Sequence, residues 1–112
     1  MNFVNLTSHE IVIQDTEGTI IVVEPSGIVA RVSQKNIPLT TIQNIPVSEV
    51  VYGDIELPEP KLDTMYIVSA IVASFPQCAQ RADVVAPDTG PTAIRNEAGH
   101  VAAVRGLVRY SK

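Results

Sequence analysis

The sequence predicts a mostly β fold, either a β-sandwich or a barrel-like arrangement of antiparallel and mixed sheets, with at most one short helix. Three observations predict it. Hydrophobic residues make up 46% of the 112 residues and charged residues 18%, which is typical of a chain with a packed core. Aromatic residues are only 4%, with no Trp, so β-branched Val and Ile must build that core. The apolar runs are short and separated by turn formers, and the length suits a single domain, 1–112.

The first elements alternate between short apolar runs and turns. Residues 3–6 (FVNL) and 10–15 (EIVIQD) predict strands. The turn sequence DTEGT then leads into the apolar run 20–23, so we expect a hairpin. Residues 24–27 (EPSG) predict another turn, because Pro fixes its own φ and Gly tolerates a positive one.

The middle of the chain predicts further strands. Residues 28–33 (IVARVS) alternate in polarity, and 38–57 are rich in Thr, Ile and Val. Within this second stretch we expect one or two strands interrupted by Pro46. Residues 57–61 (LPEPK) predict an exposed connection, because two prolines in three positions oppose both helix and central strand.

The last third contains the most apolar segment and a hairpin. Residues 64–75 (TMYIVSAIVASF) predict a buried strand that turns into a short helix near Ser69 to Phe75 and is stopped by Pro76. Turn formers fill 86–91 (APDTGP). Residues 93–110 then predict a strand, a turn at NEAG and a closing strand.

The sequence also predicts a soluble, cytoplasmic protein. The single cysteine, Cys78, excludes an intramolecular disulfide and a Cys-rich zinc site. The start MNFVNLTSHEIVI has no basic region and is broken by polar residues, which favours a first strand over a secretory signal. No apolar run reaches the roughly 18 residues that span a bilayer. We therefore expect no membrane association.

Charge is distributed unevenly along the chain. Residues 1–63 hold nine acidic and three basic residues, a net charge of −6, whereas 81–112 hold three acidic and five basic residues, a net charge of +2. The overall charge of −4 argues against binding long nucleic acids, which select a basic face. The asymmetry suits a small anion or complementary contacts between identical subunits. Solvated charges scattered over both faces would explain it equally well.

Catalytic and cofactor signatures are missing from the sequence. His9 and His100 are far apart and belong to no metal-binding motif, and Cys78 has no partner motif, so it is interpreted as a packing residue. Ser69 lacks the G-x-S-x-G turn of a nucleophile, and the glycine fingerprints of phosphate and dinucleotide sites do not occur. We expect no metal and no cofactor, and enzyme activity has no support in the sequence.

Arginine gives the best indication of a site. Arg95, Arg105 and Arg109 fall on the predicted closing hairpin, where Arg105 and Arg109, four residues apart on one strand, would share a face. With Arg81 they would present several guanidinium groups to a phosphate or carboxylate. The alternative is that these arginines pair with the neighbouring acids Asp83, Asp88 and Glu97.

The chain resembles a group of small proteins of unassigned function from bacteriophages, prophages and some bacteria. The resemblance rests on VNLTSHEIVI, EPSGIVARV, YIVSAIVA, RADVVAPDTGP and GHVAAVRGLVR, and it spans nearly the whole chain. It differs from the group at Ser8, where Pro is common, and by the insertion QCA before Gln80. It implies a bacterial host cell and no known activity. The matching positions are Asn5, Thr7, His9, Ala30, Arg31, Ser69, Arg81, Asp83, Pro87, Arg105, Gly106 and Arg109.

Three functional hypotheses follow from the sequence. The first is a non-enzymatic, homo-oligomeric phage-type protein that sequesters a small anionic ligand, for instance a nucleotide immune signal, and so counters host defence. The second is a structural or protein-interaction module that pairs through an exposed strand. The third is a small hydrolase with a histidine base near Asp83. For the first hypothesis, the expected ligand-binding residues are Arg81, Arg105, Arg109, Arg95, His9, Asn5 and Asp83.

Overall fold

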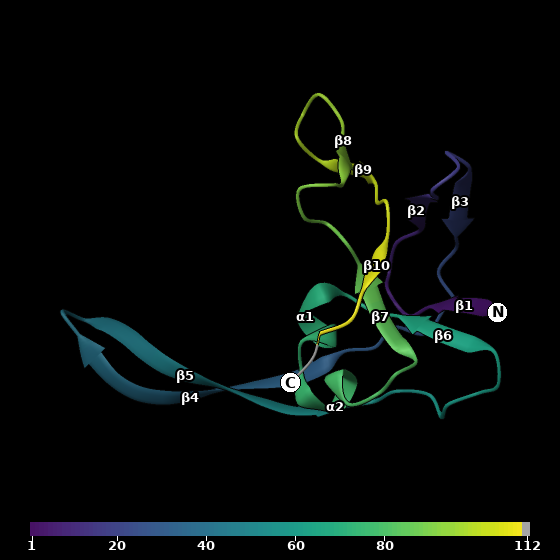
Figure 1. The fold of residues 1–112 in the computed structure, drawn as a ribbon. Helices are drawn as coiled ribbons and strands as arrows, with labels where there is room; N and C mark the ends of the chain where they lie inside the picture. Colours follow the sequence, from purple (N-terminus) through teal and green to yellow (C-terminus); the bar gives the residue numbers. More distant parts are fainter. Residues whose placement is uncertain (111–112) are drawn as a thin grey trace.

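The computed structural model describes residues 1–110 and confirms the mostly β class (Figure 1). A four-stranded mixed sheet has the order β1-β6-β7-β10, with β1 (Asn2–Asn5) parallel to β6 (Thr64–Ile67), β6 parallel to β7 (Val84–Pro87), and β10 (Leu107–Val108) antiparallel to β7. Three two-stranded ribbons surround it: β2 (Ile11–Gln14) with β3 (Ile20–Val23), β4 (Val32–Ile42) with β5 (Ile45–Ile55), and β8 (Ile94–Arg95) with β9 (Val101–Ala103). No helix of the described part is long and apolar enough to cross a membrane.

Alternation along the central strands divides the core into two clusters. Tyr66, Val68, Val84 and Ala86 face one side with the helix residue Val72, whereas Ile67 and Val85 face the other side with residues of the β2 hairpin. Successive side chains of a strand point to opposite faces, so a sheet that buries both faces needs apolar residues at every position. Residues 66–68 (YIV) and 84–86 (VVA) satisfy this requirement. Helices therefore cover one face of the sheet, and the β2–β3 hairpin covers the other.

Two short helices connect β6 to β7, where the sequence predicts one. Helix α1 (Ala70–Ala73) begins after Ser69, whose Oγ accepts a hydrogen bond from the Val72 amide at 3.3 Å. Helix α1 ends before Pro76, as expected, and Pro76 then occupies the first turn of a second helix, α2 (Pro76–Ala79). Proline fits there because the first amides of a helix have no internal partner. The strand and helix predicted within 64–75 are confirmed.

The hairpin turns differ in how well their sequences predict them. Gly18 (φ 84°), Gly27 (φ 95°) and Gly99 (φ 84°) take the positive φ expected of their turns. The β4–β5 turn instead places Gln43 (φ 50°) and Asn44 (φ 66°) in the left-handed region. This two-residue turn fits the twist of a hairpin. Pro46, expected to interrupt a strand, lies just inside β5, where its missing amide costs little near the tip.

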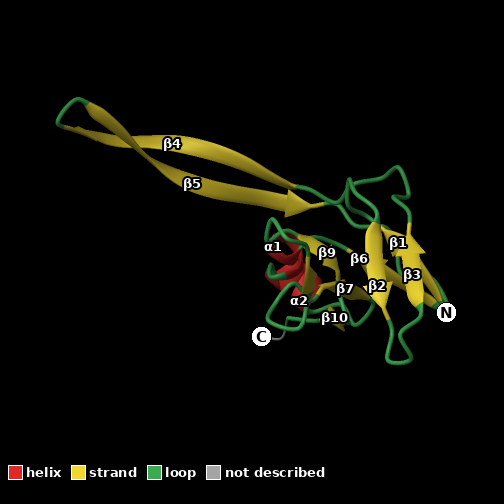
Figure 2. Cartoon of the chain, turned by 90° about the horizontal axis from the view of Figure 1, so that it is seen from above, coloured by secondary structure: helices red, strands yellow, loops and turns green. Residues whose placement is uncertain are grey.

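The β4–β5 hairpin, called the ribbon below, projects from the rest of the molecule, called the body (Figures 1 and 2). Its base joins the core, because Val32 and Ile55 pack against the cluster on the helix side of the sheet. Beyond the base nearly every ribbon side chain is exposed. The projection makes the chain elongated, with extents of 56 × 39 × 28 Å.

Candidate functional site

Asn5 organises the chain around the β1–β2 connection. Among residues 1–110 it is the one buried polar side chain, 1% exposed. Its Nδ2 donates to the carbonyls of His9 (2.8 Å) and Val23 (3.0 Å), and its Oδ1 accepts from the Thr7 amide (2.9 Å) and the Thr7 hydroxyl (2.6 Å). All the groups of this amide are therefore satisfied inside the protein. Asn5 was expected to contact a ligand, but the structure gives it the role of holding this connection in place.

A network of backbone hydrogen bonds fixes the same connection to two other segments. The Leu6 amide donates to the Ile67 carbonyl at 2.8 Å, and the Ala30 amide donates to the Leu6 carbonyl at 2.9 Å. These bonds bring Thr7 and Ser8 beside the segment that leads from β3 to the ribbon. Arg31 in that segment consequently lies near residues that are more than 20 positions away in sequence.

A cleft of about 430 Å³ opens where these segments meet α1 and the base of the ribbon. We call it the Arg31 cleft. Its polar groups come from the β1–β2 connection, Arg31, the ribbon and the start of α1, and its apolar wall comes mainly from α1 and two aromatic rings. Ligand pockets commonly have volumes of about 300–1,000 Å³. The lining residues are Leu6, Thr7, Ser8, Val29, Ala30, Arg31, Val32, Gln34, Tyr52, Ser69, Ile71, Val72 and Phe75.

The two aromatic rings hold the ribbon against the helices. Tyr52 and Phe75 lie with ring centroids 5.1 Å apart and ring planes at 76°, an edge-to-face contact. Beside them, the Gln77 side chain accepts from the Ile55 amide at 3.3 Å and donates to Asp54 at 3.5 Å. These contacts fix one wall of the cleft relative to the other.

Arg31 is the cation of this cleft. Its side chain is exposed, and it forms no hydrogen bond or ion pair with any residue of the described part. It also borders a neighbouring hollow, of about 560 Å³, that contains the carboxylates of Asp54 and Glu56. An unpaired guanidinium retains all five of its donors for a ligand.

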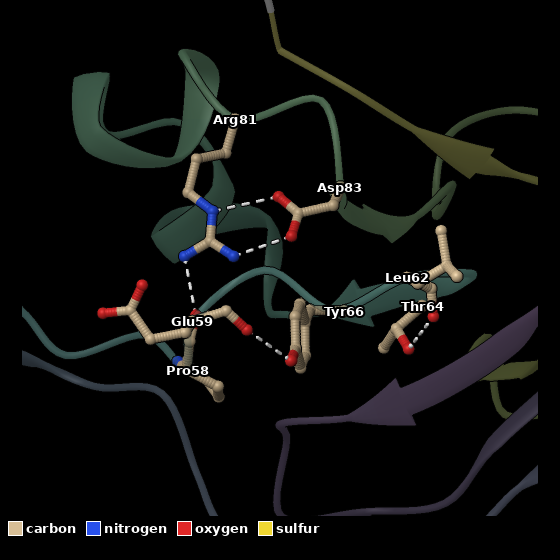
Figure 3. Close-up of polar contacts among 7 residues, drawn as sticks. All are labelled: Pro58, Glu59, Leu62, Thr64, Tyr66, Arg81 and Asp83. Atoms are coloured by element: carbon tan, nitrogen blue, oxygen red, sulfur yellow. Dashed lines mark hydrogen bonds and ion pairs between the residues drawn. The ribbon is translucent and has the colours of Figure 1, made fainter.

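Arg81 has a structural role (Figure 3). Its Nε and Nη2 donate to the two carboxylate oxygens of Asp83 at 2.9 and 2.7 Å, and its Nη1 donates to the Pro58 carbonyl at 2.9 Å. The guanidinium lies 5.7 Å from the centre of the Tyr66 ring, whose hydroxyl donates to the Glu59 carbonyl at 2.9 Å. Hydrogen bonding to Asp83 raises the pKa of Arg81, and hydrogen bonds from Arg81 lower the pKa of Asp83. The pair fastens the loop before β6 to the start of β7.

The arginines of the closing segment do not lie on one hairpin strand. Arg95 donates to the carbonyls of Gly99 (2.9 Å) and Thr89 (3.1 Å) and so holds the β8–β9 loop. Arg105 and Arg109 are exposed and flank β10, outside the strands. The expected shared strand is wrong because the chain leaves β9 before Arg105 and then pairs with β7 as β10. None of Arg81, Arg95, Arg105 and Arg109 lines the Arg31 cleft.

The two histidines and the cysteine lie in three different environments. His9 is exposed and borders a second cavity, of about 480 Å³, between β2 and β9. His100 is exposed in the β8–β9 turn, where its amide donates to Asn96. Cys78 is buried, and burial raises the pKa of its thiol, although Arg81 acts in the opposite direction. Both oxygens of Asp83 are engaged by Arg81, so it does not serve as the partner of a histidine base in this arrangement. Within residues 1–110, no three His, Cys, Asp or Glu side chains group to hold a metal ion.

Comparison of the chain with protein-family models, curated proteins and solved structures gave no match. Function is therefore inferred from the geometry of the chain itself. The sequence pointed to Arg81, Arg105 and Arg109 because they are close in sequence. It missed Arg31, Tyr52 and Phe75 as site residues, since only the fold brings these three segments together.

Proposed function

We propose that the protein binds a small anionic ligand with a flat ring, of the nucleotide class, in the Arg31 cleft and holds it without chemical conversion. The observation that carries the proposal is the unpaired Arg31 guanidinium in a cleft that also contains the Tyr52 and Phe75 rings. Arginine binds phosphate oxygens in a bidentate geometry. Base rings stack on aromatic side chains, and each stacked base contributes about 1–3 kcal/mol to the binding free energy.

Hydroxyl groups add to the polar end of the cleft. Thr7, Ser8 and Ser69 line it together with Arg31. The Ser69 oxygen accepts the Val72 amide, so its own hydrogen is available to a phosphate oxygen. The Thr7 hydroxyl already donates its hydrogen to Asn5, so Arg31, Ser8 and Ser69 supply the side-chain donors. Retention of a ligand needs these donors and no general base.

Two features bear on the biological role. Thr7, Ala30, Arg31 and Ser69, which come from three separate segments, belong to the pattern shared with the phage-type proteins and also line this cleft. The chemistry of the cleft supports binding of a nucleotide, and the resemblance to phage-type proteins favours sequestration of a nucleotide immune signal as its role. The carboxylates of Asp54 and Glu56 in the neighbouring hollow oppose an anion, so affinity depends on the ligand reaching Arg31 directly.

Thermal unfolding of the full chain against a panel of mononucleotides, cyclic dinucleotides and ADP-ribose tests the proposal. A ligand at a hundred times its dissociation constant stabilises the fold by about 2.7 kcal/mol. For the ligand that gives the largest shift in melting temperature, we expect Arg31→Ala to raise the dissociation constant about tenfold or more, because it removes a charge-assisted contact. Mass analysis of the recovered ligand should show it unchanged.

Arg105→Ala is the matched control, because Arg105 is also exposed and lies outside the cleft. Retained binding in this variant and lost binding in Arg31→Ala would support the cleft. Loss of binding in Arg105→Ala alone would move the site to the closing segment. Recovery of a cleaved ligand would replace sequestration by hydrolysis, and no shift across the panel would refute nucleotide binding.

A further inference from the structure

The ribbon presents two faces of different character. Paired residues of β4 and β5 share a face, and the observed pairs include Lys35 with Val51, Ile37 with Glu49, and Ile42 with Ile45. Together with Thr40 and Val47, these residues form one face, called the apolar face. The opposite face carries Gln34, Asn36, Pro38, Thr41, Pro46, Ser48, Val50 and Tyr52.

The apolar face has no partner among the body residues that the structure describes. Its branched residues are Ile37, Ile42, Ile45, Val47 and Val51, and Ile42 and Ile45 at the tip are 59% and 61% exposed. Tyr52, on the opposite face, makes the contact with Phe75 of the body. At its base, therefore, the apolar face points away from the helices. Isolated two-stranded ribbons have marginal stability in water and need a further packing surface.

Charge on the ribbon favours contact with an identical ribbon. Residues 36–48, which form its outer part, contain no charged side chain, whereas the whole chain has a net charge of −4. Two copies approaching through this part avoid the repulsion that their other acidic surfaces would cause. Charge depletion with apolar residues is the composition of the centre of a homodimer interface.

The two charges that border this uncharged part are of opposite sign and lie on the apolar face. They are Lys35 on β4 and Glu49 on β5. A two-fold contact uses the same surface of both copies, so a residue of one copy meets a different residue of the other, and the reverse contact follows by symmetry. When the ribbons of the two copies run parallel, with β4 of each copy over β5 of the other, Lys35 of one copy lies near Glu49 of the other, and the apolar face is complementary to itself.

We propose that the protein forms a homodimer in which the apolar faces of two ribbons pack against each other. The Arg31 cleft lies on the body side of the ribbon base, so this contact leaves it open to a ligand. The dimer is independent of the nucleotide proposal, since it uses the opposite face of the same hairpin.

Sedimentation velocity of the full chain over about 1–200 µM tests this contact. We expect a dimer at the higher concentrations and a dissociation constant raised at least tenfold by Val51→Lys, which places a charge in the contact. The matched control is Val50→Lys, because the two valines are neighbours with 43% and 42% exposure on opposite faces. A monomeric wild type, or equal weakening by both substitutions, would overturn the proposal.

A charge exchange keeps the test decisive if Val51→Lys fails to fold by circular dichroism. Lys35→Glu and Glu49→Lys should each weaken the dimer, because like charges then meet across it. The double variant restores opposite charges and should recover dimerisation. A double variant as weak as the two single variants would refute the proposed pairing.

Discussion

Ile67 and Ile42 are both branched residues of β strands, yet Ile67 is fully buried and Ile42 is 59% exposed. Ile67 lies in a central strand of the body, between β1 and β7, with apolar neighbours on its face. Ile42 lies at the end of the ribbon, where each strand has one neighbour. The body buries its apolar residues within one chain, and the ribbon does not. A hydrophobic pattern therefore specifies a strand but does not determine what covers it.

Truncation of these two isoleucines should give the largest contrast. Ile67→Ala removes a fully buried side chain and should lower the free energy of unfolding by about 4 kcal/mol, through lost transfer free energy and a cavity. Ile42→Ala should cost less than about 0.5 kcal/mol, a typical surface value, when the chain is dilute enough to be monomeric. Urea unfolding at low protein concentration measures both. Equal costs would mean that the ribbon folds back on the body in solution.

Asn5→Ala should have the next largest effect, about 3 kcal/mol, because it removes a buried side chain and leaves its partly buried partners without a hydrogen bond. The matched control is Asn2→Ala, an exposed asparagine on the same strand. Chemical unfolding of the two variants compares them. A small effect of Asn5→Ala would show that water replaces the side chain in the body.

The ion pair of Arg81 and Asp83 should give a smaller, pH-dependent effect. The pKa of Asp83 is lowered in the folded state, so its contribution is present above the unfolded pKa of about 4 and is lost as pH falls through the lower folded pKa. Asp83→Asn should therefore destabilise the body by about 1 kcal/mol at pH 7, and its difference from wild type should shrink below about pH 4. Unfolding curves between pH 7 and pH 2 measure this. Glu97→Gln is the control. A difference in unfolding free energy between Asp83→Asn and wild type that stayed the same at every pH would contradict the role given to the ion pair.

The ribbon turn should give the smallest effect. Gln43 has a positive φ of 50°, which glutamine rarely adopts, whereas Asn-Gly is the preferred pair for such a turn. The double substitution Gln43→Asn and Asn44→Gly should stabilise the ribbon by about 0.5 kcal/mol. Hydrogen exchange should slow across the ribbon and stay unchanged in β6 and β7. Slower exchange in both regions would show that they open together.

The parts of the fold that depend on neighbouring residues could be predicted from the sequence. The β2–β3 hairpin, the helix after Ser69 and the β8–β9 turn are confirmed, because glycine positions and short apolar runs determine them locally. The ribbon was missed as a single long hairpin because Gln43-Asn44 is a weak turn signal and Pro46 suggested an interruption. The parallel pairing of β1 with β6 has no local signal at all.

The candidate site was harder to predict for the same reason. Arginines close in sequence suggested one cluster, but backbone pairing separates Arg95, Arg105 and Arg109 from Arg81, which binds Asp83. Arg31 is unremarkable in sequence. Its place in the cleft arises from the hydrogen bond between Ala30 and Leu6, which joins two segments that sequence patterns treat separately.

The pairing of Asn2 with Thr64 has a consequence for how the chain is made. Ribosomes add about 5–20 residues per second, so the first strand waits about 3–12 seconds for the roughly 60 residues that separate it from its neighbour. A hairpin closes within about 10 microseconds. The ribbon can therefore close while the central sheet is still absent, and the proposed contact between two nascent chains would supply the packing surface that an isolated hairpin lacks.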